Sequence, residues 1–180
     1  MTLEQRGAES GALLMVIETP RGNRAKFKYD ANAGAFRLHK LLPLGNAFPF
    51  HFGFVPSTLA EDGDPLDMLL LLEEPLPQGC VVEVRALGAI EAMQYAPEQA
   101  PVRNNRIIAV TAQSEEHSEC HTLDDLDTGL VTKIEQFFVN YNLLEGKKFN
   151  PIGRADKATA EHLIQSAADA YAAAHDVAHI

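Results

Sequence analysis

CVVEVRALGAI, residues 80–90, is the stretch that decides the fold class. Its first half alternates apolar and polar residues and carries β-branched valines, which together indicate a β-strand. Similar short apolar patterns flank it: LLMVIE (13–18), KFKYD (26–30) paired with AFRL (35–38), DMLLLL (67–72) and RIIAVTA (106–112). The first two thirds of the chain is therefore predicted to be mostly strand, with a hairpin over residues 26–38.

The last third of the chain changes to helical spacing. Five apolar residues share one predicted helix face, namely Leu130, Ile134, Phe137, Phe138 and Tyr141. Thr128 is the expected N-cap of this helix, and Gly146 lies beyond its end. A second helix is expected from near Asp156. Strands followed by helices predict an α+β, mainly β fold: one domain over residues 1–180, with an antiparallel sheet or small barrel under two helices.

Composition narrows the function classes. Twenty-five acidic against fifteen basic residues give a net charge of −10, and no basic stripe offsets it, so neither nucleic acid nor an anionic membrane is an expected partner. Cys80 and Cys120 stand in no metal-ligand spacing and are predicted to be reduced. Without a leader pattern or an apolar run long enough to span a bilayer, the chain is expected to be cytoplasmic.

The segment EDGDPLDMLL, residues 61–70, gathers three carboxylates at the start of an apolar run. In an extended DGD segment, Asp62 and Asp64 point to the same side, and Pro65 stiffens the exit toward Asp67. Like charges held together are stabilised by a cation, and a hard ion such as Mg²⁺ or Mn²⁺ suits carboxylate oxygens. The alternative is a solvated turn before a buried strand.

The segment DGDPLD (62–67) matches at every position the signature of the soluble, single-domain, magnesium-dependent inorganic pyrophosphatases. The resemblance runs from about residue 13 to residue 173, through VIETP (16–20), AKFKYD (25–30), FPFHFGFVPSTLAEDGDPLD (48–67), PLPQGCVVEVRALGAI (75–90) and QFFVNYNLLEGKKF (136–149). It implies a five-stranded, OB-like barrel with two main helices. It also implies hydrolysis of inorganic diphosphate with Mg²⁺, or alternatively Mn²⁺, in a homo-oligomer that is a hexamer in bacterial relatives.

The resemblance also implies residue roles. Asp62 and Asp67 resemble ligands of the activating metal, and Asp64 resembles the residue that helps two metals deprotonate the attacking water. Glu18 resembles an acidic support of the metal cluster. The residues that resemble substrate-binding groups are Lys26, Lys40, Arg106 and Tyr141, the last beside the leaving phosphate. Taken alone, Glu18 could equally be a surface charge, Lys26 a solvated lysine and Tyr141 a core residue.

Several positions depart from the family pattern. Lys40 replaces an arginine, Phe52 a tyrosine, Asn142 a lysine, Lys28 an acidic residue, Gln94 and Asn104 two aspartates, and Arg106 a lysine. Amides bind divalent ions more weakly than carboxylates, and the exchanges make the site about three charge units more positive. We therefore expect weaker metal binding, unless Glu91 or Glu98 replaces the missing ligands.

Three functions follow from these residues. The first is metal-dependent hydrolysis of inorganic diphosphate, with activity reduced by the substitutions. The second is a catalytically degenerate member of the family that binds metal, phosphate or a protein partner. The third is the same type of reaction on another phosphoanhydride or on a phosphate ester.

Overall fold

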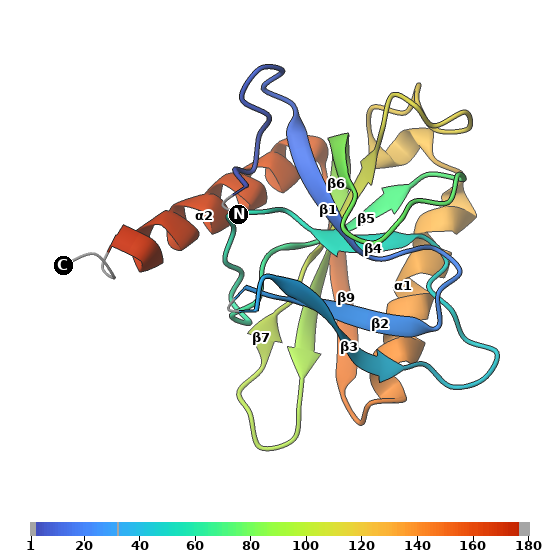
Figure 1. Cartoon of the computed structure of the whole chain (residues 1–180). Coiled ribbons are helices and arrows are strands. Elements are labelled where there is room, and N and C mark those ends of the chain that lie inside the picture. Colours follow the sequence, from blue (N-terminus) through green and yellow to red (C-terminus); the bar gives the residue numbers. More distant parts are fainter. Residues whose placement is uncertain (1–2, 32, 177–180) are drawn as a thin grey trace.

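The computed structural model describes residues 3–31 and 33–176, and its centre is a β-barrel (Figure 1). Strands β1 (Leu13–Thr19), β4 (His51–Phe54), β5 (Asp67–Leu71), β8 (Arg106–Val110) and β6 (Val81–Tyr95) follow one another in this order. A further pairing of β1 with β6 closes the ring. The predicted five-stranded barrel is therefore confirmed. All its pairings are antiparallel except that of β5 with β8.

Four shorter or peripheral strands complete the β-structure. Strands β2 (Ala25–Asp30) and β3 (Ala35–Leu41) form the predicted hairpin as a separate two-stranded sheet. Strands β7 (Val102–Arg103) and β9 (Lys148–Ala155) pair with the long strand β6. The apolar pattern missed β4, β7 and β9, because β4 has four residues with a glycine, β7 has two residues, and β9 contains proline and glycine.

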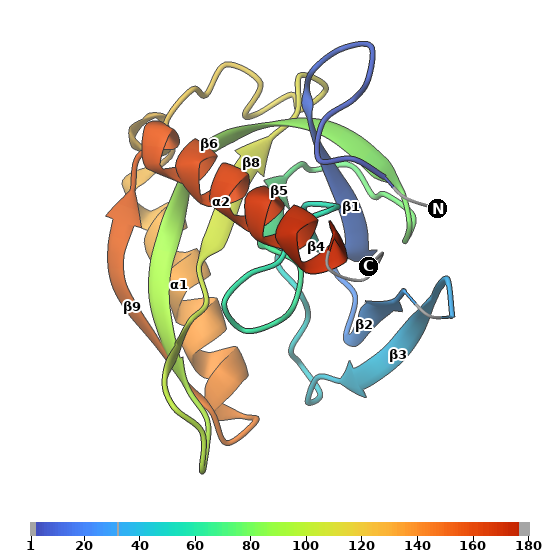
Figure 2. The same cartoon turned by 90° about the vertical axis from the view of Figure 1, so that its left-hand side faces the viewer.

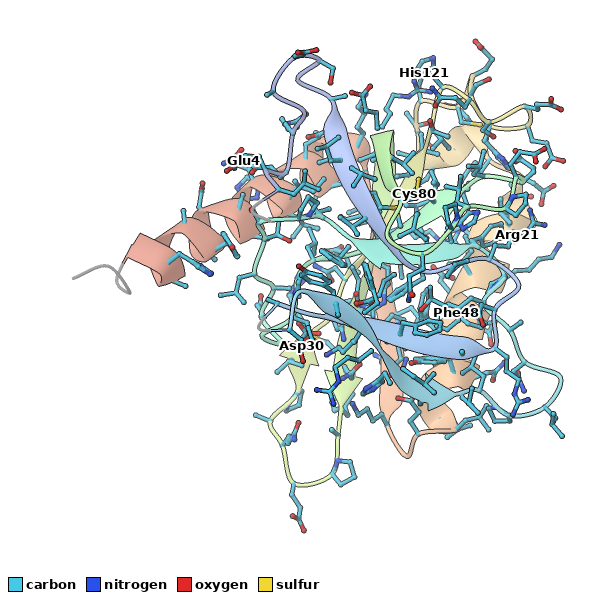
Figure 3. The ribbon with its side chains drawn as sticks, viewed as in Figure 1. Glu4, Arg21, Asp30, Phe48, Cys80 and His121 are labelled. Atoms are coloured by element: carbon cyan, nitrogen blue, oxygen red, sulfur yellow. The ribbon has the colours of Figure 1, made fainter. Side chains whose placement is uncertain are left out.

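Two helices cover opposite faces of the strands β5 and β8 (Figure 2). On β5, Met68 and Leu70 join the cluster packed on α2 (Lys157–Asp176), whereas Leu69 and Leu71 join the cluster packed on α1 (Thr128–Leu143). A strand buried on both faces needs apolar residues at every position, which explains the continuous run DMLLLL. Side chains such as Phe48 point into this interior, whereas Glu4 and His121 lie at the periphery (Figure 3).

The helix ends agree with the sequence prediction at two of the three predicted positions. Helix α1 starts at Thr128, but the cap is Asp127, whose carboxylate accepts a hydrogen bond of 2.9 Å from the Gly129 N–H. The prediction of Thr128 as the cap was therefore wrong by one residue. Asp156 precedes α2 and accepts from the Thr159 N–H at 2.8 Å, and Gly146 has a left-handed φ of 69° after α1 ends. A short 3₁₀ turn (Leu123–Asp125) leads into α1.

The state of the two cysteines and the hydropathy of the helices can be compared with the sequence predictions. Cys80 and Cys120 are both free, as predicted. Within residues 3–31 and 33–176, no helix is long and apolar enough to cross a membrane.

Candidate active site

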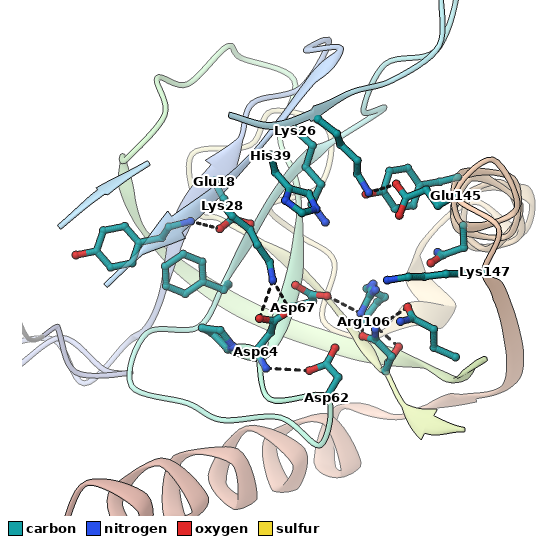
Figure 4. A pocket seen from close by; sticks show the side chains of 18 residues that line it. Glu18, Lys26, Lys28, His39, Asp62, Asp64, Asp67, Arg106, Glu145 and Lys147 are labelled. Carbon is teal, nitrogen blue, oxygen red and sulfur yellow. Dashed lines mark hydrogen bonds and ion pairs between the residues drawn. The ribbon is translucent and has the colours of Figure 1, made fainter. Parts of the chain in front are cut away.

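A polar pocket of about 150 Å³ lies at one end of the barrel, between the β2–β3 hairpin and the C-terminal end of α1 (Figure 4). Every residue predicted for the site lines it: Glu18, Lys26, Lys40, Asp62, Asp64, Asp67, Arg106 and Tyr141. Five cationic and five carboxylate side chains are present in the lining, since Lys28, Lys147 and Glu145 join that set. These residues come from β1, β2, β3, β5, β8, α1 and two loops, so the fold as a whole builds the pocket.

The acidic wall of the pocket is the turn before β5. Gly63 adopts a left-handed φ of 84°, and the Asp64 N–H donates a 3.2 Å hydrogen bond to Asp62 Oδ1. Asp67 is the first residue of β5. Burial, followed by the nearby Asp67 charge, raises the pKa of the Asp62 carboxyl. The three carboxylates are half-buried, so they are less exposed than those of a fully solvated turn.

Two ion pairs offset the charge of this wall. The Lys28 ammonium on β2 contacts both Asp64 oxygens, at 2.6 and 2.7 Å. The Arg106 guanidinium lies 2.6 Å from Asp67 Oδ2, with only 5% of the Arg106 side chain exposed. The protein therefore supplies two of its own cations at carboxylates that the family resemblance assigns to metal ions.

Gln94 on β6 and Asn104 between β7 and β8 are two amides in place of the expected aspartates. Gln94 and Asn104 both line the pocket, and the Asn104 Nδ2 donates a 2.9 Å hydrogen bond to Gln94 Oε1. The Asn104 side-chain oxygen also accepts from Arg106. Glu91 instead pairs with Arg103 at 3.2 Å, and neither Glu91 nor Glu98 lines the pocket. The pocket lining therefore does not support the alternative in which Glu91 or Glu98 replaces the missing ligands.

The carboxylates of the pocket do not form a tight three-ligand group in the described part of the chain. Among the described residues, only Glu73, Glu116 and His117 place three ligand atoms within 4.8 Å of one another, and that group lies outside the pocket. Asp62, Asp64 and Asp67 form no such group, and two of them pair with Lys28 and Arg106. The donor set thus suits a divalent ion at the acidic wall, but the amide side adds no charged ligand.

Glu18 lies on the pocket floor. Its side chain accepts a 2.6 Å hydrogen bond from the Tyr29 N–H, and the residue is buried. Burial raises the pKa of this carboxyl to about 7, although the Tyr29 hydrogen bond and the Lys26 charge oppose the shift. Glu18 can therefore hold or release a proton near neutral pH.

Aromatic rings surround the buried cation Lys26. Its ammonium lies 5.1 Å from the centre of the Phe52 ring and 5.4 Å from that of the Tyr141 ring. Burial lowers the pKa of Lys26, while the faces of the two rings favour its charged form. Phe52, which stands where the family has a tyrosine, thus contributes a cation-binding ring face instead of a phenol.

The C-terminal end of α1 and Lys40 of β3 form another side of the pocket. The hydroxyl of Tyr141 is buried and has no hydrogen-bond partner among the described residues, and burial raises its pKa. The Lys40 ammonium lies 4.4 Å from the Tyr141 ring centre and forms an ion pair with Glu145. Burial and the charges of neighbouring lysines lower the pKa of Lys40, whereas the Glu145 contact favours its charged form.

Sequence reasoning did not single out three groups that line the pocket: His39, Glu145 and Lys147. The paired lysines at residues 147–148 were the available signal for the last of these. A small pocket in which carboxylates and cations lie side by side suits a multiply charged phosphate anion and a metal ion. The fold and the site thus define a barrel-type hydrolase of small phosphate compounds.

Comparison with known proteins gives the particular family. The family model for inorganic pyrophosphatase matches residues 15–172. The inorganic pyrophosphatase of Thermus thermophilus is 41% identical over 134 residues, which cover 74% of each chain, and that of a Nostoc species is 31% identical over 161 residues, covering 89% of this chain and 92% of the relative. The Thermus thermophilus crystal structure superimposes with a TM-score of 0.84 at 34% identity, over 94% of this chain and 97% of that one.

The chain therefore belongs to the inorganic pyrophosphatase family, and by this homology it is an inorganic diphosphatase. The family is metal-dependent.

Proposed function

We propose that the pocket between the β2–β3 hairpin and α1 is the site of diphosphate hydrolysis. The observation that carries this proposal is the convergence of all eight predicted residues on one pocket of mixed charge. Its size suits a small polyanion, and its ten charged side chains are balanced in number, so an added anion and an added cation offset one another there.

Asp62, Asp64 and Asp67 are the residues that would hold a divalent ion, for which we propose Mg²⁺, with Mn²⁺ as an alternative. Carboxylate oxygens are the ligands that both ions prefer. When bound, such an ion supplies positive charge near the phosphoryl oxygens and lowers the pKa of a nearby water. The half-buried wall and the clustered negative charge support this assignment.

The chain's own residues then act on the substrate. Lys26, Lys40 and Arg106 bind phosphoryl oxygens and offset the charge that spreads over them. The Tyr141 hydroxyl, which lacks a partner among the described residues, donates a hydrogen bond to the departing phosphate. Glu18 holds the floor of the pocket and exchanges a proton near neutral pH.

We further propose that this site binds metal more weakly than one with a full set of carboxylates. Lys28 competes with a metal for both oxygens of Asp64, and Gln94 and Asn104 are bound to each other. The Lys28 contact offsets a negative charge that would otherwise attract a divalent ion, and the two amides offer such an ion no charged ligand. Hydrolysis is accordingly expected to require higher Mg²⁺ concentrations than at a site with a full set of carboxylates.

The test is phosphate release from inorganic diphosphate during Mg²⁺ and Mn²⁺ titrations, with metal binding measured separately by calorimetry. Parallel assays with a nucleoside triphosphate and an aryl phosphate would test the third function. Faster phosphate release from either compound than from diphosphate would identify a different preferred substrate. Metal and diphosphate binding without any turnover would favour the binding-protein alternative. The variant Asp124→Asn is a suitable control, since Asp124 is exposed and lies outside the pocket.

We also propose a homo-oligomer, with a hexamer as the expected form. Large apolar side chains are exposed at two neighbouring places, with Leu44 84% exposed after β3 and Leu143 and Leu144 68% and 57% exposed at the end of α1. Exposed large apolar side chains of this kind favour association. Light scattering at micromolar concentration tests the proposal, and a single monomeric species would reject it. A cytoplasmic location stays a prediction, to be tested by cell fractionation.

A further inference from the structure

The position after Tyr141 carries no charge in this protein. Asn142 is only 2% exposed, and its Nδ2 donates a 2.9 Å hydrogen bond to the Phe138 carbonyl oxygen one turn earlier in α1. Its amide is thus engaged by its own helix. The cation that the family resemblance places at this position must come from elsewhere if the pocket has one.

The turn between α1 and β9 brings a lysine to the same part of the pocket. Gly146 adopts a left-handed φ of 69°, and the Lys147 N–H then donates a 3.0 Å hydrogen bond to the Asn142 carbonyl oxygen. This folds the chain back on the helix end. The Lys147 side chain consequently lines the pocket and extends toward the side of Arg106 (Figure 4).

Lys147 differs from the other pocket cations in its partners. Lys28 pairs with Asp64, Arg106 with Asp67, and Lys40 with Glu145. The buried Lys26 ammonium lies over aromatic rings.

Lys147 is half-buried and makes no side-chain hydrogen bond or ion pair with any residue in the described part of the chain. Its positive charge is close enough to lower the pKa of both Lys40 and His39. Like charges held this close are stabilised when an anion binds between them.

We propose that Lys147 binds a phosphate group of the diphosphate substrate and supplies the positive charge that residue 142 lacks. This inference rests on the proposed function of the pocket. Lys147 acts from the turn after α1 instead of from the helix itself. It is therefore a substrate-binding residue that the spacing along the helix does not predict.

The chain provides a matched control in the next residue. Lys148 is the first residue of β9, is exposed, and lies outside the pocket with its ammonium 5.5 Å from the Tyr95 ring centre. The variants Lys147→Met and Lys148→Met remove the same charge from adjacent positions. Any general effect of net charge on anion binding should be equal in the two variants.

The experiment measures binding of methylene diphosphonate, a diphosphate analogue whose P–C–P bridge cannot be hydrolysed, by calorimetry with Mg²⁺ and again in EDTA. Lys147→Met should weaken binding about tenfold or more, because a charge-assisted hydrogen bond is lost. Lys148→Met should change it less than about twofold, as expected for an exposed charge outside the site. Lys147→Arg should retain most of the affinity, because it keeps the charge.

Equal affinities of Lys147→Met, Lys148→Met and the unchanged protein would overturn the proposal. The binding measurement also distinguishes a failure of the Lys147 proposal from a failure of the proposed function. Normal diphosphate turnover with an unchanged KM in Lys147→Met leaves the function standing and rejects the role of Lys147. Selective loss of diphosphonate binding in Lys147→Met, in a protein without turnover, supports Lys147 and rejects the catalytic function.

Discussion

The Lys28 ammonium contacts both carboxylate oxygens of Asp64, at 2.6 and 2.7 Å, and so joins the β2–β3 hairpin to the acidic turn before β5. The two residues are 36 positions apart in the sequence. This ion pair places a side-chain cation at the carboxylate that the family resemblance assigns to water activation. A metal ion must share or displace the contact in order to use Asp64.

Removing the competing charge should strengthen metal binding. We expect Lys28→Met to raise Mg²⁺ affinity about tenfold, because both Asp64 oxygens become available and a repelling cation leaves the pocket. Calorimetric Mg²⁺ titration without substrate measures this directly. Lys133→Met, which removes an exposed lysine of α1, is the control. An affinity that does not change in Lys28→Met would mean that the metal does not bind at Asp64.

Restoring carboxylates at residues 94 and 104 should act in the same direction. The double variant Gln94→Asp with Asn104→Asp is expected to raise Mg²⁺ affinity about tenfold or more and to increase turnover, since two charged oxygen ligands replace neutral amides. The measurement is phosphate release across a Mg²⁺ titration. Gln99→Asp with Asn46→Asp adds the same charge at exposed positions outside the pocket. A similar gain in that control would attribute the effect to net charge alone.

The Asp67 carboxylate has two proposed roles. It is a ligand of the proposed metal site, and it forms an ion pair with the buried Arg106. We expect Asp67→Asn to abolish Mg²⁺ binding and hydrolysis, and to lower the free energy of unfolding by about 1–3 kcal/mol as the guanidinium loses its charged partner. Calorimetry and urea denaturation test the two effects separately. Unchanged Mg²⁺ affinity would remove Asp67 from the site, whatever happens to stability.

The sequence predicted the fold well where strands are buried on at least one face. Strands β1, β5 and β8 are all apolar runs, and the hairpin β2–β3 is bounded by turn residues. The parallel pairing of β5 with β8 was not predictable, since it depends on how β6 closes the barrel between distant segments. Strand β9 was missed because Pro151 and Gly153 hide its pattern.

In the candidate site, too, some features were predictable from the sequence and others were not. The motif around Asp62 and the family spacing were sufficient to predict the residues that converge on the pocket. The sequence did not predict which of them are neutralised by other side chains, because ion pairs such as that of Lys28 with Asp64 join distant segments. Lys147 was missed for a local reason, since the left-handed Gly146 decides which of two adjacent lysines enters the pocket.

Gly53 should be essential for the register of the barrel. A Cβ atom at this position would lie 1.9 Å from the Val16 carbonyl oxygen on the neighbouring strand β1. Because that contact is with backbone, no side-chain rotation can relieve it, and we expect Gly53→Ala to lower the free energy of unfolding by about 3 kcal/mol or more. Urea denaturation measures the loss. Gly129→Ala, where the nearest neighbour is a side-chain oxygen at 3.1 Å, should cost much less, and equal losses would contradict the close approach of β1 and β4.

His51 should make the protein less stable in mild acid. The imidazole is fully buried, its Nδ1 accepts a hydrogen bond from the Arg21 N–H at 3.2 Å, and its Nε2–H donates to the Glu74 carbonyl oxygen at 2.9 Å. This arrangement requires the neutral ring, and burial lowers the pKa of His51 below its usual value of 6.5. As the pH falls below 6.5, the unfolded state takes up the proton first, so stability is lost.

Glu18 has the opposite effect over part of the same range, and the experiment must separate the two. Its pKa rises from 4.5 to about 7 on folding, so its ionisation reduces stability as the pH increases between those values. The thermal midpoints of the unchanged protein and of His51→Gln should therefore be compared at each pH from 7.5 to 5. We expect His51→Gln to be less stable at pH 7.5, where it loses a satisfied buried group, and the difference to shrink toward pH 5. His162→Gln, an exposed position on α2, should show no such trend. A difference that stays constant with pH would mean that His51 does not titrate in this range, since Glu18 is the same in both proteins and cancels.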